Sequence, residues 1–546
     1  MVAAAPSPPL VPPLALIALG AVCLLGLFST EAADTDFWWH LKTGKYVVQR
    51  RALPAPDPFS YTAYLGRPAY AGEEKVRYFN LTHEWLAQAV WYLIWRFGGF
   101  GAVVLWKAVL LTAFCGLGGV IASRRGGSVY WGLAAAGATV SVARWFSADR
   151  PALVSFLLVA VFVWILERDR PLWLLPVLSA VWANSHGGFF LGWIVVGAYA
   201  AAAPRKLWRI AALTVAASVL NPNHIRILEV LLAYRQSNLQ QMLVEWSRPP
   251  LWGPPYAFPA LLWGGAAVLA LGWRRVKLSD WILFGLFAAA AVTAFRNVVL
   301  VAFLAPVLIA TYWPWRRPLP ALAGPVAAAA LGLALVVGVW QGKFFQLRAA
   351  LWRFPEGASR FLVEHRITGP MFNTYELGGY LLWRLWPQQK VFIDGRSLNE
   401  SVFRDYQNAI SLQDRGVLDR YGVQIVVANA FESTSGVIYP LVLALGDRSA
   451  TAWNLVYEDP QAVVFARQPA TGLPALDKAR VTEHLESECR LIIEHDPELC
   501  LCARTLGFRF LQAGDRQRAR RALALYLGSP HEPDAEAEAA YRQVSR

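Results

Sequence analysis

The sequence has little charge and few cysteines. Of its 546 residues only 16% are charged and five are cysteines, and no CxxC pair, zinc-binding spacing, P-loop or Ser-His-Asp order is present. These absences exclude a disulfide-framed domain, a zinc finger and the common nucleotide-binding and triad motifs. Cys489, Cys500 and Cys502 lie close enough in sequence for one disulfide in an oxidising compartment, and the pairing stays open.

Hydrophobic residues make up 56% of the chain and include 25 tryptophans, which indicates an integral membrane protein. We expect a polytopic α-helical bundle over residues 1–340 with about eleven transmembrane helices. The apolar runs lie near 10–29, 100–122, 129–146, 151–166, 172–183, 189–203, 210–220, 256–272, 279–294, 298–313 and 321–340. The first run lacks a basic flank and a cleavage site, so we expect it to be retained as a helix.

The net charge of +14 comes from short basic clusters in alternate loops, which argues against nucleic acid as a partner. By the positive-inside rule these loops are cytoplasmic, and a large first loop at 30–99 and everything after about 341 lie on the outer side. The clusters are Arg124 with Arg125, Arg168 with Arg170, Arg205 with Lys206 and Arg209, Arg274 with Arg275 and Lys277, and Arg316 with Arg317.

Beyond residue 341 the composition becomes mixed. Short apolar runs such as KVFIDGR, VQIVVAN and AVVFAR alternate with the helical patterns EGASRFLVEH and ELGGYLLWRLW, which predicts an extracytoplasmic α/β domain over 341–470. Asp394 and Arg396 follow an expected strand, although such an Asp more often forms a turn than binds a ligand. The tail, 471–546, contains one tetratricopeptide-like helix pair, which must pack on a neighbour or extend toward an envelope protein partner.

The stretch DTDFWWHL, residues 34–41, opens the outer loop with two carboxylates. Asp36, or else Asp34, is a candidate general base, because burial and nearby charge move a carboxylate pKa toward the working pH. The alternative is that the two residues only cap the following helix. His40 lies on the same helical face as Asp36. Trp38 and Trp39 are interpreted as interfacial anchors.

Further polar residues gather in the predicted outer loops, which indicates a working cavity at the outer helix ends rather than a transport path through the spans. His83 and Glu84 either complete the site or cap a helix. Arg144, Arg150 and Arg296 are candidates to bind a lipid phosphate. The alternative is that they form structural ion pairs, for example with Asp149 or Glu245. The asparagine side chains of these loops are candidates to bind sugar hydroxyls. The alternative is that they satisfy backbone groups at helix breaks. The candidate binding residues are His40, His83, Glu84, Arg144, Arg150, Asn184, His186, Asn221, Glu245, Arg296 and Asn297.

As a set, these segments resemble the C-type superfamily of integral-membrane glycosyltransferases (GT-C), and more narrowly an uncharacterised bacterial group within it. The resemblance rests on DTDFWWHLKTGKYVV, PDPFSYT, HEWL, RPALVSFLL, ANSHGGFFLG, LNPNHIRIL, VEW, FRN and GGYLLWRLWPQQKVFIDGR. It implies sugar transfer from a polyprenyl-phosphate donor, with Asp34 or Asp36 near the reacting centre. The superfamily's later acidic motif has only Glu84 or Glu245 as a counterpart here, which leaves a divalent metal ion open.

We therefore expect a glycosyltransferase of the bacterial inner membrane that acts on an envelope lipid, glycan or protein with inversion at the sugar, and that contacts membrane lipids. The alternatives are a non-catalytic scaffold of envelope assembly and a lipid-linked sugar flippase. The scarcity of ionisable groups within the spans counts against the flippase.

Overall fold

The computed structural model describes residues 11–168, 171–234, 236–238, 244–315, 320–469 and 472–545. The chain divides into two compact units: unit 1 comprises Met1–Pro54 and Tyr78–Ala349, and unit 2 comprises Ala55–Arg77 and Ala350–Arg546. Of the basic residues that orient the predicted topology, Arg170, Arg316 and Arg317 lie outside the described residues, and the orientation stays a prediction.

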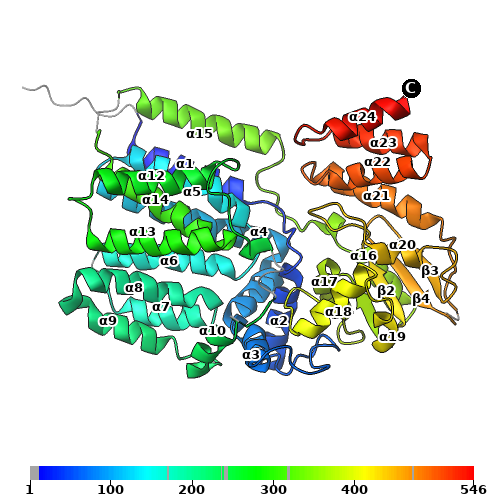
Figure 1. Ribbon diagram of the computed structural model, residues 1–546. Helices are drawn as coiled ribbons and strands as arrows, with labels where there is room; N and C mark the ends of the chain where they lie inside the picture. The colour runs from blue at the N-terminus through cyan, green and yellow to red at the C-terminus, as the bar shows by residue number, and fades with distance from the viewer. Residues whose placement is uncertain are drawn as a thin grey trace, which may run out of the picture. The chain divides into compact units, whose positions relative to one another are not determined.

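Unit 1 is a helical bundle, and each of the predicted apolar runs overlaps one of its helices (Figure 1). The helices are α1 (Pro13–Phe28), α2 (Phe37–Arg50), α4 (Trp85–Gly126), α5 (Val129–Ala143), α6 (Ala152–Arg168), α7 (Leu174–Ala183), α8 (Phe190–Ala202), α9 (Pro204–Ala217), α10 (Ile227–Tyr234), α12 (Ala257–Leu271), α13 (Leu278–Thr293), α14 (Val298–Tyr312) and α15 (Ala323–Trp340). Helix α3 (Glu73–Thr82) begins in unit 2 and ends in unit 1.

Short 3-10 helices join several of these elements: η1 (Arg144–Phe146), η2 (Gly187–Phe189), η3 (His224–Arg226), η4 (Val244–Trp246) and η5 (Phe295–Asn297). Helix α14 is apolar all round and almost completely buried, and it packs against α4, α5, α12 and α13. A helix of this kind forms the centre of a bundle.

Helix α2 lies against α4 at Gly44. A Cβ at Gly44 would lie 2.0 Å from the backbone oxygen of Gln88, so only glycine permits this approach. Because Asp36 is the residue that precedes α2, this contact fixes where Asp34 and Asp36 stand.

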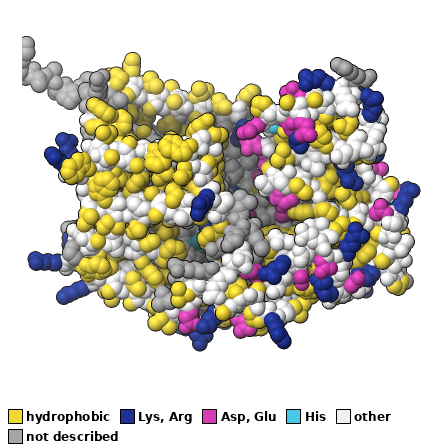
Figure 2. Space-filling model, viewed as in Figure 1, with side chains coloured by type: hydrophobic (Ala, Val, Ile, Leu, Met, Phe, Trp, Pro, Cys, Tyr) yellow, Lys and Arg dark blue, Asp and Glu magenta, His cyan; other side chains and the backbone are white. Residues whose placement is uncertain are grey.

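Three helical stretches of the described chain are long and apolar enough to cross a membrane: Glu73–Gly126, Phe295–Tyr312 and Ala323–Trp340. Five shorter apolar helices accompany them, and the full number of about eleven spans stays a prediction. Figure 2 shows hydrophobic side chains over much of the visible face of unit 1, while charged side chains of both signs are mixed over unit 2. The protein is therefore a membrane protein with a mainly helical fold and a small sheet.

Unit 2 contains a sheet of four strands in the order β1-β2-β4-β3. β1 (Met371–Asn373) pairs parallel with β2 (Ile425–Ala428), and β4 (Val463–Arg467) pairs antiparallel with both β2 and β3 (Trp453–Glu458). The helices are α16 (Glu356–Glu364), α17 (Tyr375–Leu385), α18 (Glu400–Ile410), α19 (Val417–Arg420) and α20 (Pro440–Leu445), after the short η6 (Leu351–Arg353). The sheet and its flanking helices form an α/β fold.

Residues 55–77 of the predicted outer loop belong to unit 2 because a buried ion-pair cluster holds them there. The Arg396 guanidinium donates to Asp57 at 2.6 Å and to both carboxylate oxygens of Asp394 at 2.6 and 2.7 Å, and all three side chains are buried. The expectation of a strand over KVFIDGR is wrong: Val391 forms only an isolated bridge to Ser60, since the segment is engaged by this cluster.

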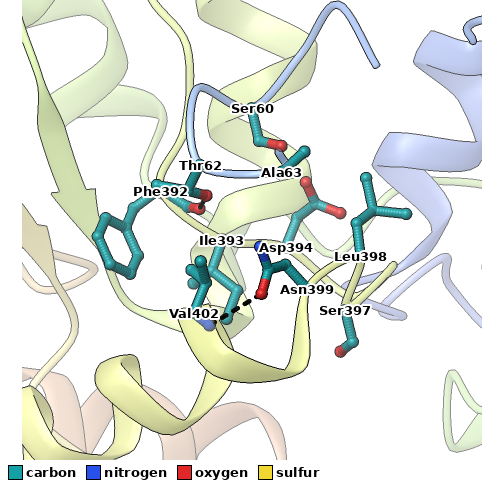
Figure 3. Close-up of a pocket in the computed structure, with 10 residues that line it drawn as sticks. All are labelled: Ser60, Thr62, Ala63, Phe392, Ile393, Asp394, Ser397, Leu398, Asn399 and Val402. Carbon is teal, nitrogen blue, oxygen red and sulfur yellow. Dashed lines mark hydrogen bonds between the residues drawn. The ribbon is translucent and has the colours of Figure 1, made fainter. Parts of the chain in front are cut away.

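Asp394 and Arg396 are thus structural in this fold. The small pocket of Figure 3 is lined by Ser60, Thr62, Ala63 and part of 392–402, and its Asn399 accepts a hydrogen bond of 3.2 Å from the Val402 N–H. The pocket has a volume of about 20 Å³, room for roughly one water molecule.

The tail forms four helices: α21 (Arg480–His495), α22 (Leu501–Gln512), α23 (Arg516–Leu527) and α24 (Ala535–Ser545). Each packs on the next in sequence, with α22 and α23 forming the predicted pair. A disulfide joins Cys489 to Cys502, and Cys500 is free and buried.

Replacing Arg396 should destabilise unit 2. Arg396→Met leaves Asp57 and Asp394 buried without their cation, which costs about 3–5 kcal/mol. We expect a clear fall in the apparent Tm of the detergent-solubilised protein. Arg448→Met is the matched control, because Arg448 is 82% exposed and pairs with Asp477 only at 3.8 Å. Equal Tm values for the two variants would contradict this account.

Candidate active site

Asp34 and Asp36 lie directly before α2, and their side chains face the same arginine. Asp36 is the N-cap residue of α2, yet its carboxylate accepts no capping hydrogen bond from the helix. Asp34 instead accepts from the backbone N–H of Asp36 at 3.2 Å. The alternative that the pair merely caps the helix therefore does not describe the Asp36 side chain, which is free to take part in ion pairs.

Arg150 pairs with three carboxylates of unit 1, two from the loop before α2 and one from η4. Its guanidinium donates to Asp34 at 2.5 and 2.9 Å and to Glu245 at 2.8 Å, and it lies 3.2 Å from Asp36. Asp34 and Asp36 are largely buried, whereas the Glu245 side chain is 51% exposed. We call these four residues the Arg150 cluster. With all groups ionised it carries two more negative than positive charges.

Within the cluster, Asp34 and Asp36 have different pKa values. Burial raises the pKa of Asp34, but the charge and hydrogen bonds of Arg150 outweigh it, so the pKa lies below its usual value. Burial raises the pKa of Asp36 to about 6, because Arg150 offsets it only in part and the Asp34 charge adds to the increase. Asp34 is thus a permanent anion, while Asp36 exchanges its proton near neutral pH.

Glu84 stands at the centre of a second group, with three histidines around its carboxylate. The distances from Glu84 oxygens are 3.4 Å to His40 Nδ1, 3.3 Å to His83 Nε2 and 3.8 Å to His186 Nε2. Burial lowers the pKa of His40 to about 4 and of His186 to about 3, against the opposing charge of Glu84. Both imidazoles are therefore neutral at pH 7. Three of the predicted binding residues thus converge on a fourth.

The neighbours of His186 define its tautomer. Its Nδ1 accepts from the Gly188 N–H at 3.0 Å and lies 2.7 Å from Ser155 Oγ, which itself accepts from the Trp182 indole N–H at 2.7 Å. The Ser155 hydroxyl proton therefore points to Nδ1, so Nε2 carries the imidazole proton and directs it toward Glu84.

Arg144 and Arg296 belong to 3-10 helices that pack together. Trp145 of η1 stacks on Phe295 of η5 with ring centroids 6.0 Å apart, which places the two arginines on contacting turns. Arg296 lies over the Trp246 ring at 4.8 Å. Among the described residues neither arginine forms an ion pair, so their charges are not neutralised as that of Arg150 is.

The asparagine side chains predicted to bind sugar hydroxyls form hydrogen bonds to backbone oxygens instead. Asn184 donates to Ala180 O and Leu220 O and accepts from the Trp85 indole. The Asn221 and Asn297 amides likewise donate to backbone oxygens at 2.6 and 3.1 Å. These contacts match the alternative of satisfied helix breaks.

Three other residues of the predicted outer loops differ from the expected arrangement. His224, the fourth histidine of those loops, is exposed and outside both groups. Trp38 is not an exposed interfacial anchor: it is buried and packs edge-on against Phe37 and Phe100. Trp39 is buried as well.

Lys107 is a functional candidate that sequence reasoning missed, and it, rather than an arginine, is the ion-pair partner of Asp149. Lys107 Nζ lies 3.2 Å from Asp149 Oδ2, and both side chains are 1% exposed. Burial raises the pKa of Asp149 to about 6, opposed by Lys107 and assisted by the charge of Asp34. A single lysine inside the apolar run of α4 was the available signal, because such a charge must be paired.

No group of three or more His, Cys, Asp or Glu side chains within the described ranges has an arrangement that could hold a metal ion. The oxygen donors that a divalent cation would use are Asp34, Asp36 and Glu245, and the Arg150 guanidinium contacts all three.

No protein-family model matches the sequence, and no curated protein matches it either. The structure is similar to archaeal oligosaccharyltransferase AglB from Archaeoglobus fulgidus in complex with an inhibitory peptide and a dolichol-phosphate, with a TM-score of 0.51 and 10% identity over 86% of this chain and 77% of that chain. The structure is also similar to the Archaeoglobus fulgidus oligosaccharyltransferase in the apo form. The TM-score is 0.50 and the sequence identity is 11% over 84% of this chain and 75% of that chain. The chain shares this fold. At such low identity the likeness establishes the fold alone.

Asn substitution should lower stability at Asp34 but not at Asp36. The lowered pKa of Asp34 means that its ionised form stabilises the fold above its unfolded pKa of about 4 and that this contribution is lost as pH falls through the folded pKa. The raised pKa of Asp36 means that its ionisation opposes folding above about 6. At pH 7.5 we expect Asp34→Asn to lower the apparent Tm by about 2–5 °C and Asp36→Asn to leave it unchanged or raise it.

At pH 5 the lower Tm of Asp34→Asn should persist. Any increase in the Tm of Asp36→Asn should become smaller, because Asp36 is then mostly protonated in the folded protein. Thermal unfolding of both variants at the two pH values measures this. A larger loss in Asp36→Asn than in Asp34→Asn at pH 7.5 would contradict the assignment.

Proposed function

We propose that the protein is a glycosyltransferase of the bacterial inner membrane, which moves a sugar from a polyprenyl-phosphate donor to an envelope lipid, glycan or protein on the extracytoplasmic face. The observation that carries the proposal is the Arg150 cluster, in which a buried carboxylate exchanges its proton near neutral pH beside a permanently ionised one. The fold shared with an oligosaccharyltransferase supports the reaction class.

In the proposed reaction, Asp36 accepts the proton of the acceptor hydroxyl or amine as that atom attacks the anomeric carbon of the sugar. The bond from the anomeric carbon to the phosphate oxygen breaks, and its electron pair leaves with the lipid phosphate. Attack opposite the leaving group inverts the sugar configuration. Asp34 keeps Arg150 beside Asp36 through two hydrogen bonds, and the guanidinium favours the ionised base.

The leaving phosphate needs cations that carboxylates do not already neutralise. Arg150 pairs with three carboxylates, so Arg144 and Arg296 are better suited to bind the phosphate. The aromatic rings of Trp145, Trp246 and Phe295 around these two arginines give the polyprenyl chain an apolar surface beside the charge.

Asp36→Asn should abolish transfer, because an amide cannot accept the proton. Mass spectrometry of lipid-linked and surface glycans compares cells that lack the gene with cells complemented by the wild type, by Asp36→Asn or by Asp477→Asn, in which a 62% exposed carboxylate is removed. We expect the wild type and Asp477→Asn to restore the glycan and Asp36→Asn to leave the donor accumulated.

The wild-type rate, followed as loss of that accumulated donor, should fall below a pH of about 6 as Asp36 becomes protonated. Full glycan restoration by Asp36→Asn would instead favour the non-catalytic scaffold.

Arg296→Met should weaken donor binding. Loss of a charged hydrogen-bonding partner of phosphate costs about 1.5–3 kcal/mol, so KM for the lipid donor should rise about 10- to 100-fold with a smaller change in kcat. Arg274→Met is a matched control, because Arg274 also lies over a tryptophan ring, at 5.0 Å from that of Trp273, but in a predicted cytoplasmic loop. An equal KM for both variants would exclude Arg296 from the phosphate site.

A further inference from the structure

A buried lysine connects the two loops that supply the Arg150 cluster. Lys107 lies in α4, and its ammonium group uses all three of its N–H donors: it donates to Thr30 O at 2.9 Å, to Thr30 Oγ1 at 3.3 Å and to Asp149 at 3.2 Å. Thr30 precedes Asp34 by four residues, and Asp149 directly precedes Arg150. One ammonium group therefore links the segment that carries the base to the segment that carries its arginine.

The segment around Thr30 is also held from its other side. Ala32 forms a parallel bridge with Ala349 and donates its N–H to Arg348 O at 3.0 Å, while the Gln346 N–H donates to Ser29 O at 2.7 Å. The backbone of residues 29–32 thus has fixed neighbours on two sides. The loop at 147–150 has no such strand partner among the described residues, and besides the ion pairs of Arg150 it is attached to the bundle through the pair of Asp149 with Lys107.

We propose that Lys107 is a positioning residue: by binding Thr30 and Asp149 together, it sets the distance between Asp36 and Arg150. The proposal rests on the proposed function, in which Asp36 is the base. Lys107 touches none of the Arg150 cluster in the described contacts, so its effect must pass through the two loops.

The informative variant is Lys107→Met with Asp149→Asn. Removing Lys107 alone would leave the Asp149 charge unpaired in the interior, whereas neutralising both partners of a buried pair is often tolerated. Lys343→Met with Asp477→Asn is the matched control, since it removes one exposed lysine and one exposed aspartate.

Two readouts are compared in the purified full chain. The first is kcat and KM for the lipid-linked sugar extracted from cells that lack the gene. The second is the infrared titration of Asp36, taken as the protonated-carboxyl signal that Asp36→Asn removes. Arg150, Asp34 and Glu245 are the charged groups that face Asp36.

We expect the double variant to stay folded, with kcat about tenfold lower, KM within about twofold, and the Asp36 titration moved to higher pH because Arg150 no longer holds its place. An unchanged kcat with an unmoved titration would overturn the proposal. Aggregation of the double variant on size-exclusion chromatography would also overturn it, because the pair would then be needed for folding itself. If the wild type itself shows no turnover, the proposed function fails, and the titration alone still decides what Lys107 positions.

Discussion

The structure of the candidate active site depends on the ion pairs of Arg150. One guanidinium holds Asp34 and Asp36 from the loop before α2 and Glu245 from η4, in a bundle that otherwise contains little charge. Buried carboxylates of like charge repel one another and lose hydration, so they share a site only where a cation compensates. The same compensation is uneven, which gives Asp34 and Asp36 different proton affinities and separate roles.

The remaining polar residues of the site divide according to whether the protein already satisfies them. The Asn184, Asn221 and Asn297 amides bond to backbone at helix breaks. The buried ion pairs of Arg396 with Asp57 and Asp394 connect residues 55–77 to the rest of unit 2. Arg296 has an aromatic ring as its described neighbour instead of a carboxylate. A polar group whose bonding capacity is already used serves the fold, whereas an unneutralised cation beside aromatic rings is suited to an anionic lipid.

The sequence predicts the helices well because long apolar runs report burial or membrane contact directly, and each run overlaps a helix. It also places Asp36, Glu84 and Arg150 in the same region through loop charges. It misjudges residues 390–396, where a strand-like pattern forms an ion-pair cluster, since pairing depends on distant partners such as Asp57. Lys107 was missed for the same reason: its partners Thr30 and Asp149 are far from it in sequence.

The most direct test is an experimental structure of the protein in lipid with a bound polyprenyl phosphate. The account predicts that the phosphate lies within hydrogen-bonding distance of Arg296 or Arg144 and that the Asp36 carboxylate faces the bound lipid. It also predicts that Arg150 keeps its contacts with Asp34. A phosphate bound at the other ends of the helices, near Arg125 or Arg274, or an Asp36 carboxylate closed off from the bound lipid, would contradict it.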